Sequence, residues 1–153
     1  MTPPVSLDDV DKALIRLLQS DGRASYADLA PQVGLSAPAV RQRVQRLVDA
    51  GVLQIVGVTD PLALGLPVMA LVGVRVQGDA RAVADALAEI DNVVYLVTTA
   101  GSFDLFAEVV CRDMDELFAV VNDRIRVVPG VSAAESFPYF GIHTHRFTWG
   151  VPE

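Results

Sequence analysis

Arginine and glutamine side chains crowd into one short stretch in the first third of the chain: Arg41, Gln42, Arg43, Gln45 and Arg46. An arginine can donate paired hydrogen bonds to a guanine edge or to a phosphate, and a glutamine can pair in the same way with adenine. At about 100° per residue, the apolar residues of the stretch fall on the opposite arc of a helix. These apolar residues are Val40, Val44, Leu47 and Val48. The spacing predicts an amphipathic helix whose polar face can enter the major groove of DNA; the same residues also suit a helix that simply faces solvent.

The neighbouring residues place this helix in a helix-turn-helix. Ser36 is a typical helix N-cap, Pro38 fits the first turn, and Gly51 follows the last turn. A short helix that starts at Tyr26 and is capped by Ser25 precedes it, and the turn between the two helices contains a glycine. Two helices joined by so short a turn cross each other, which leaves the outer face of the second helix open to solvent.

The first domain is expected to span residues 1–60, with the helix-turn-helix at about 26–45. A longer helix, capped by Ser6 and ending at Asp21, is predicted before it, and residues 52–59 have the β-branched composition of a strand or wing. The free N–H groups at the start of the third helix also suit a phosphate. The predicted DNA contacts are Ser25, Tyr26, Ser36, Ala37, Pro38, Arg41, Gln42, Arg43, Gln45 and Arg46.

A connector at residues 61–67, with two prolines and a glycine, separates this segment from a second domain at 68–153. The patterns there predict a strand, a helix, two strands, a helix and a strand, at residues 68–76, 80–90, 93–98, 105–111, 114–128 and 131–140. This order is that of a ferredoxin-like βαββαβ fold, in which two helices cover one face of an antiparallel sheet. The fold class is therefore α+β. The other face of the sheet needs a cover, which predicts a homodimer.

Composition narrows the function classes. The chain of 153 residues is too short for a large multidomain enzyme, and its hydrophobic content of 52% is too high for a disordered chain. Its net charge of −7 argues against nucleic acid only if that charge is evenly spread. Residues 1–60 carry −1 and the remainder −6, whereas the arginine-rich helix is locally +2. The acidity therefore belongs mainly to the second domain, where it limits nonspecific contact with DNA.

The sequence predicts no membrane span, reactive thiol, metal site or catalytic site. No apolar stretch reaches the roughly 18 residues that span a bilayer, and residues 1–7 do not resemble a signal peptide, so we expect a cytoplasmic protein with no membrane partner.

The single cysteine, Cys111, is expected to be a buried small hydrophobe. His143 and His145 alternate and would share one strand face, where such residues either hold a metal with a third ligand or pack across an oligomer interface; we predict no metal. No catalytic side-chain set or phosphate-binding loop can be assembled, which argues against an enzyme and a cofactor.

Several segments resemble the Lrp/AsnC family, the feast/famine transcription regulators of bacteria and archaea. In the first domain these segments are residues 8–23, Leu29-Ala30, 33–36 and 43–53, which are similar to the family's winged helix-turn-helix. In the rest of the chain they are the connector at 60–65, a glycine-to-aspartate loop at 99–104 and the entry to the last strand at 128–131. The resemblance extends over residues 6–140.

By this resemblance, the second domain is an amino-acid-metabolism regulation domain, which pairs its sheets in a dimer and often assembles dimers into octamers. Family effectors are usually amino acids bound near the glycine-to-aspartate loop. Gly101 lets N–H groups approach a carboxylate and Asp104 can accept a hydrogen bond from an ammonium group. From the residues alone, however, the segment is more typical of a tight hairpin than of a binding site. The implied effector residues are Thr98, Thr99, Ala100, Gly101, Ser102, Phe103 and Asp104.

The resemblance thus implies a nucleoid-associated, sequence-specific transcription regulator that responds to an amino acid or a related small metabolite. Its paired third helices would read two half-sites of double-stranded DNA. The alternative is a nucleoid-architectural or small-molecule-binding protein with little sequence specificity. The run at residues 140–150 is more aromatic than the usual end of the family, and the sequence assigns it no role.

Overall fold

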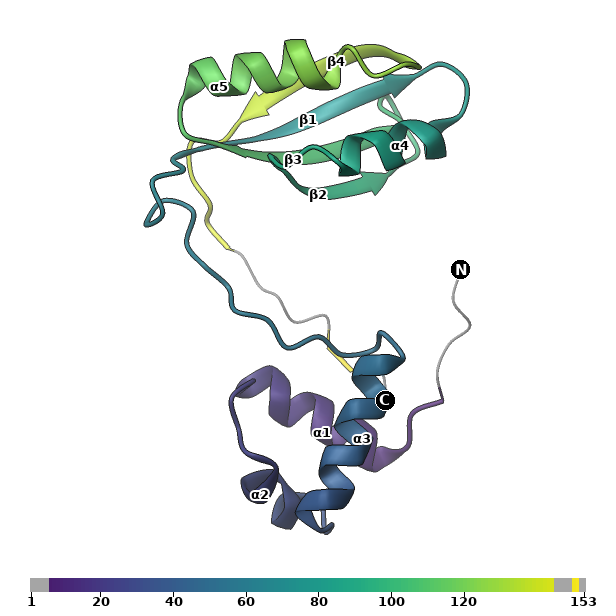
Figure 1. The fold of residues 1–153 in the computed structure, drawn as a ribbon, viewed down its shortest axis with the longest axis vertical. Helices are drawn as coiled ribbons and strands as arrows, with labels where there is room; N and C mark the ends of the chain where they lie inside the picture. Colours follow the sequence, from purple (N-terminus) through teal and green to yellow (C-terminus); the bar gives the residue numbers. More distant parts are fainter. Residues whose placement is uncertain (1–5, 145–149, 152–153) are drawn as a thin grey trace. The chain divides into compact units, whose positions relative to one another are not determined.

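The computed structural model describes residues 6–144, 150 and 151. The chain divides between Val58 and Thr59 into two compact units, each with a hydrophobic core of its own (Figure 1). None of the helices in this part of the chain is long and apolar enough to cross a membrane.

In the part of the first unit that the structure describes, the chain forms three α-helices and one 3-10 turn, η1. The elements are α1 (Asp9–Ser20), α2 (Tyr26–Leu29), η1 (Ala30–Gln32) and α3 (Ala37–Asp49). The three α-helices follow the order that the sequence predicts, and η1 is an addition to it. Their apolar faces meet in one core in which Leu14, Val40 and Leu47 are fully buried. Val151, which the sequence analysis assigns to the second domain, packs against this first core.

The start of α1 differs from the prediction. Its N-cap is Asp8 and not Ser6: the Asp8 carboxylate accepts a hydrogen bond from the N–H of Asp11 at 2.8 Å, and the Asp11 carboxylate accepts from the N–H of Asp8 at 3.3 Å. This capping box satisfies two of the free N–H groups at once. A carboxylate also interacts more favourably than a hydroxyl with the positive end of the helix dipole, which favours Asp8.

The predicted wing strand at residues 52–59 is absent from the described structure. Leu53 joins the first core, but Ile55, Val56 and Val58 are each about half exposed or more. A strand requires a hydrogen-bonded neighbour, and the one sheet among the described residues does not include this segment. The β-branched composition predicts a strand, but it does not supply the hydrogen-bonded partner that makes one.

The second unit is a four-stranded antiparallel sheet with strand order β2-β3-β1-β4, and its two helices lie on one face (Figure 1). The elements are β1 (Val68–Val76), α4 (Ala80–Ala88), β2 (Val93–Thr98), β3 (Leu105–Cys111), α5 (Met114–Ala119) and β4 (Val131–Pro138). A π-helical segment, η2 (Val120–Ile125), continues α5. The ferredoxin-like prediction is confirmed.

The predicted long helix at 114–128 is therefore not a regular α-helix. Leu117, Val121 and Ile125 are buried as expected, but Phe118, which the periodicity also places on the apolar side, is 69% exposed. Val120 is buried in its place: it lies three residues after Leu117, on the same side of the helix, and joins the core under the sheet.

Alternate residues of the sheet point to its two faces. Ala70, Val72 and Val74 of β1 are fully buried under the helices. The face away from the helices carries a second apolar set, because the register aligns Leu71 with Phe137 and Gly73 with Phe106. We call it the open sheet face; its apolar members are Met69, Leu71, Tyr95, Val97, Phe106, Val110 and Phe137.

Candidate DNA interface and effector loop

The arginine-rich helix α3 is held by its apolar side and exposes its polar side. Val40, Val44 and Leu47 are at most 1% exposed, whereas Val48, predicted on the same arc, lies at its edge and is 38% exposed. The helix begins as predicted: the Ser36 hydroxyl accepts a hydrogen bond from the N–H of Ala39 at 3.4 Å, and a proline occupies the first turn. Burial of one face fixes which side chains can meet a ligand.

The outermost side chains of α3 surround an open hollow on the surface. Arg41 and Gln42 are exposed, and their side chains make no hydrogen bond to another residue in the described part of the chain. Gln45 is also exposed, but its Nε2 donates to Asp49 Oδ1 at 2.8 Å. The hollow is lined by Pro38, Arg41, Gln42, Gln45, Arg46, Asp49 and Ala50. Among the described residues that line the hollow, Arg41 and Gln42 therefore keep their side-chain polar groups available to a ligand.

Arg43 and Arg46 form ion pairs with acids of α1, which are not among the predicted contacts. Arg43 Nη1 donates to Asp8 Oδ2 at 2.6 Å and to Asp11 Oδ1 at 2.8 Å. Arg46 Nη2 donates to the other carboxylate oxygen of Asp11. The Asp11 side chain is only 1% exposed, so these are not ordinary surface pairs. Two acids of α1 therefore lie against the arginine-rich side of α3.

This ion-pair cluster shifts the pKa of Asp8 and that of Arg43. The hydrogen bond from the Asp11 N–H, followed by that from Arg43, lowers the pKa of Asp8 below its ordinary value of 3.8. The hydrogen bonds to Asp8 and then to Asp11 raise the pKa of Arg43. Both shifts favour the charged forms, as expected for an ion pair.

The lowered pKa of Asp8 predicts a loss of stability in acid. Above about pH 5 the carboxylate is charged in both the folded and unfolded chain, so the pair stabilises the first unit fully; as the pH falls below 3.8, the unfolded chain binds the proton first and this contribution is lost. Asp8→Asn is therefore expected to lower the free energy of unfolding near neutral pH, with a gap to wild type that closes toward pH 2. Denaturant unfolding between about pH 7 and 2 measures the gap; one that stays constant contradicts the prediction.

Ser25 and Tyr26 lie at the start of α2, where they have structural roles. The Ser25 hydroxyl accepts from the N–H of Asp28 at 3.1 Å and donates to Asp28 Oδ2 at 2.6 Å. Tyr26 is half-buried and packs against the first core. Ser25 remains exposed, and so does Pro38 on α3, whereas Ala37 is half-buried.

The glycine-to-aspartate loop connects β2 to β3 and is closed by its own hydrogen bonds. The N–H of Thr99 donates to the Asp104 carbonyl at 2.8 Å, and the Thr99 hydroxyl donates to the Phe103 carbonyl at 2.7 Å. The Asp104 carboxylate accepts from the N–H of Val76, at the end of β1, at 2.7 Å. One carboxylate oxygen expected to meet an ammonium group is thus already bonded to the backbone.

The exposed part of the loop is its tip. Thr98, Ala100, Gly101 and Ser102 are exposed, and Gly101 has a φ of 155°, which favours glycine. Phe103 turns the other way and packs on the open sheet face, in edge-on contact with Phe106 and Phe137 at 5.4 and 6.1 Å between ring centroids. The loop therefore presents backbone and hydroxyl groups outward while one aromatic side chain fixes it to the sheet.

Arg75 is a loop partner that sequence reasoning missed. Its guanidinium lies over the Phe103 ring, 5.4 Å from the centroid, and its Nε donates to the Ser102 carbonyl at 3.0 Å. The predicted fold contained the necessary signal, because a ferredoxin-like order places the end of β1 beside the start of β3. Arg75 brings a positive charge to the tip of the loop.

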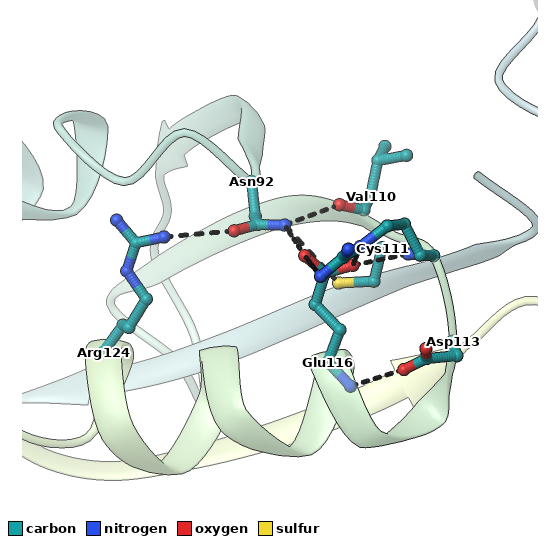
Figure 2. A network of polar contacts seen from close by, with 7 residues as sticks. Asn92, Val110, Cys111, Asp113, Glu116 and Arg124 are labelled. Atoms are coloured by element: carbon teal, nitrogen blue, oxygen red, sulfur yellow. Dashed lines mark hydrogen bonds and ion pairs between the residues drawn. The ribbon is translucent and has the colours of Figure 1, made fainter. Parts of the chain in front are cut away.

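A polar network fixes the corner between β3 and α5 (Figure 2). Asn92 Nδ2 donates to the Val110 carbonyl at 3.0 Å, and its Oδ1 accepts from Arg124 Nη1 at 3.2 Å. Cys111 lies beside this network and is fully buried, as predicted. Burial, and then the negative charges of Glu116 and Asp113, raise the pKa of its thiol, so the thiolate is disfavoured.

The sequence predicts that His143 and His145 share one strand face, but the last strand, β4, ends before them at Pro138. His143 is exposed, and His145 lies outside the described residues. Within residues 6–144, 150 and 151, no group of three or more His, Cys, Asp or Glu side chains is arranged to hold a metal ion.

Two family models match the chain. The AsnC-type helix-turn-helix domain matches residues 7–48, and the Lrp/AsnC ligand binding domain matches residues 69–146. An uncharacterized HTH-type transcriptional regulator of Pyrococcus abyssi is 31% identical over 134 residues, which cover 86% of this chain and 85% of that protein.

Solved structures share the whole fold. The leucine response regulatory protein LrpA of Mycobacterium tuberculosis superposes with a TM-score of 0.86 at 28% identity, covering 93% of this chain and 98% of the other. A transcriptional regulator of Neisseria meningitidis, NMB0573, solved in complex with L-Met, gives a TM-score of 0.81 at 24% identity, covering 96% and 97%.

These matches account for both units described above. The helix-turn-helix match contains all of α1 to α3 except Asp49, and the ligand-binding match contains the sheet with its two helices, apart from Val68. The family consists of transcription regulators and not of enzymes. The chain therefore belongs to the Lrp/AsnC family of transcription regulators, with a DNA-binding helix-turn-helix domain followed by a ligand-binding domain.

Proposed function

We propose that this regulator works as a homodimer, or an assembly of homodimers such as an octamer, that inserts paired α3 helices into successive major grooves. An amino acid or related small metabolite bound at the ligand-binding domain changes this assembly and thereby its DNA binding. The protein acts in this way on the nucleoid, in the cytoplasm. The observation that carries the proposal is the division of α3 into one fully buried apolar face and one exposed face of arginine and glutamine.

Different exposed side chains of α3 are proposed to contact base edges and phosphates. Arg41 and Gln42 have free donors and acceptors in the described structure, which suits them to base edges. Arg43 and Arg46 lie toward α1 and are suited to phosphates. Of the remaining predicted contacts, five lie at the starts of α2 and α3: Ser25, Tyr26, Ser36, Ala37 and Pro38. Gln45 lies farther along the exposed side of α3.

The tip of the glycine-to-aspartate loop is the proposed effector site. A free amino acid carries a carboxylate and an ammonium group. The exposed backbone around Gly101 and the nearby Arg75 guanidinium can bind the carboxylate. The second carboxylate oxygen of Asp104 can accept a hydrogen bond from the ammonium group. Thr98, Thr99, Ala100, Ser102 and Phe103 complete the proposed site. The L-Met complex of the Neisseria regulator supports an effector of this class.

The open sheet face is the proposed dimer interface. Tyr95 and Phe137 are 50% and 41% exposed there, and burying such aromatic area against a second copy is favourable. Tyr139 lies at its margin, where its hydroxyl is 3.3 Å from Glu108 Oε1. Burial raises the pKa of Tyr139 to about 12, followed by the charge and hydrogen bond of Glu108, so the neutral phenol persists.

Selection from a randomised duplex library tests the function. The purified chain is expected to enrich one pseudo-palindromic sequence, with half-sites separated by about one or more helical turns. Sedimentation of the free protein is expected to give the mass of a dimer or a multiple of it. A library that stays random after repeated rounds, with an even footprint on unrelated DNA, would favour the nucleoid-architectural alternative.

A thermal-shift screen with the twenty amino acids tests the effector. A ligand that binds only the folded chain must raise its apparent stability, by about 2.7 kcal/mol at one hundred times its dissociation constant. We expect at least one amino acid to raise the melting temperature and to change the affinity for the selected duplex. Absence of both effects across the set contradicts an amino-acid effector.

Arg46→Ala is expected to weaken binding to every duplex roughly tenfold, because it removes a phosphate contact and not a base contact. The slope of log affinity against log salt should fall by about 1. Titrations of the selected duplex and an unrelated one between about 50 and 200 mM salt measure both effects. Arg16→Ala, the same charge change at an exposed position of α1, is the control. An unchanged slope in Arg46→Ala would place this side chain outside the interface.

A further inference from the structure

The buried carboxylate of Asp11 joins the two helices that the DNA interface depends on. It belongs to α1, yet each of its two oxygens accepts a hydrogen bond from a different arginine of α3, one from Arg43 and one from Arg46. Its side chain is 1% exposed, while those of the two arginines are 30% and 52% exposed. The acid is thus hidden behind the arginines that cover it.

The geometry leaves both arginines able to bind a second anion. Arg43 uses only Nη1 and Arg46 only Nη2 for the acids of α1 in the described structure. A guanidinium has five N–H donors in a rigid plane, so several donors of each group remain for a phosphate oxygen. Because the side chains are already ordered, binding costs less rotamer entropy than it would for a free arginine.

We infer that Asp11 is a positioning residue for DNA recognition: it fixes Arg43 and Arg46 as phosphate contacts at the edge of α3 that faces α1. This inference rests on the proposed function and deepens it. Arginines held in one place meet phosphates in only one docking register, whereas freely moving arginines reach phosphates on any duplex. The buried carboxylate also subtracts charge from the interface, which weakens sequence-independent attraction. Asp11 therefore raises the ratio of specific to nonspecific affinity.

The test compares Asp11→Asn with wild type on two duplexes, the one enriched from the random library and an unrelated one of equal length. Freeing both arginines is expected to tighten binding to the unrelated duplex a few-fold, to steepen its salt slope by about 1, and to reduce the specificity ratio at least tenfold. A role confined to folding would lower both affinities in proportion to the folded fraction, and the ratio would not move.

Asp9→Asn is the matched control. Asp9 lies on the same turn of α1 and is exposed, so this change adds the same charge without touching either arginine. It should shift both affinities alike and leave the ratio unchanged. Equal losses of specificity in Asp9→Asn and Asp11→Asn would overturn the inference, because net charge alone would then explain the effect.

The remaining outcomes are also decisive. If Asp11→Asn does not fold, Asp11→Glu replaces it, since it keeps the charge but moves the carboxylate away from the position that meets Arg43 and Arg46; a fall in the ratio is expected, and an unchanged ratio overturns the inference. If Asp11→Asn keeps the wild-type preference for the selected duplex, the inference is overturned and the proposed function stands. A wild-type chain without any preference overturns the proposed function and this inference together.

Discussion

Leu47→Ala is expected to remove about 2–5 kcal/mol of stability from the DNA-binding domain while leaving the ligand-binding domain intact. Leu47 is fully buried on the inner side of α3, within the small core shared with α1 and α2. Truncating this side chain leaves a cavity, and the few neighbouring side chains of so small a core cannot move in to fill it. Hydrogen exchange of peptides from α1 to α3 is expected to lose at least about 30-fold in protection, and DNA affinity should fall with the folded fraction.

The separate cores provide the control for this prediction. Leu87→Ala is the same change at an equally buried leucine of α4, in the second unit. It should reduce protection in the sheet and its helices and spare the peptides of α1 to α3. If either variant destabilises both units equally, the chain unfolds as one cooperative block, and the division into two units does not describe its energetics.

Much of the fold could be predicted because its signals are local. Ser36, Pro38 and Gly51 mark the ends of α3, and period-two and helical patterns give the strand and helix order of the second unit. The failures have a common cause in contacts that are distant in sequence. The wing residues at 52–59 lack the strand partner that a strand requires, and packing against the sheet buries Val120 while Phe118 stays exposed.

The candidate site divides in the same way. The helical period alone places Gln42, Gln45 and Arg46 away from the apolar arc of α3, with Arg41 and Arg43 at its flanks. It cannot reveal that Arg43 meets Asp11, because that pair joins residues 32 positions apart through the crossing of two helices. A buried acid on an amphipathic helix is the available signal: Asp11 occupies a position on the inner face of α1, beside Leu14, Ile15 and Leu18.

Gly73→Ala is expected to destabilise the ligand-binding domain by about 1–3 kcal/mol and to disturb the effector loop. Gly73 is a buried residue of β1, and a Cβ atom placed on it would lie 2.7 Å from Cγ and Cδ2 of the Phe103 ring. The ring must therefore leave its position on the open sheet face, and it carries residues 99–104 with it. Thermal unfolding measures the first effect. The second should appear as a smaller melting-temperature shift at a fixed concentration of the amino acid found in the screen.

Two further variants separate the clash from the general cost of replacing a glycine. Gly141→Ala is made in the same unit, where an added Cβ meets no atom within 4 Å, and it should change neither stability nor effector response. Phe103→Ala removes the ring itself, so adding Gly73→Ala to it should cost little more, giving a strong coupling in the double-mutant cycle. If the two changes are additive, the ring does not transmit the effect, and the proposed dependence of the loop on the contact between Phe103 and Gly73 is wrong.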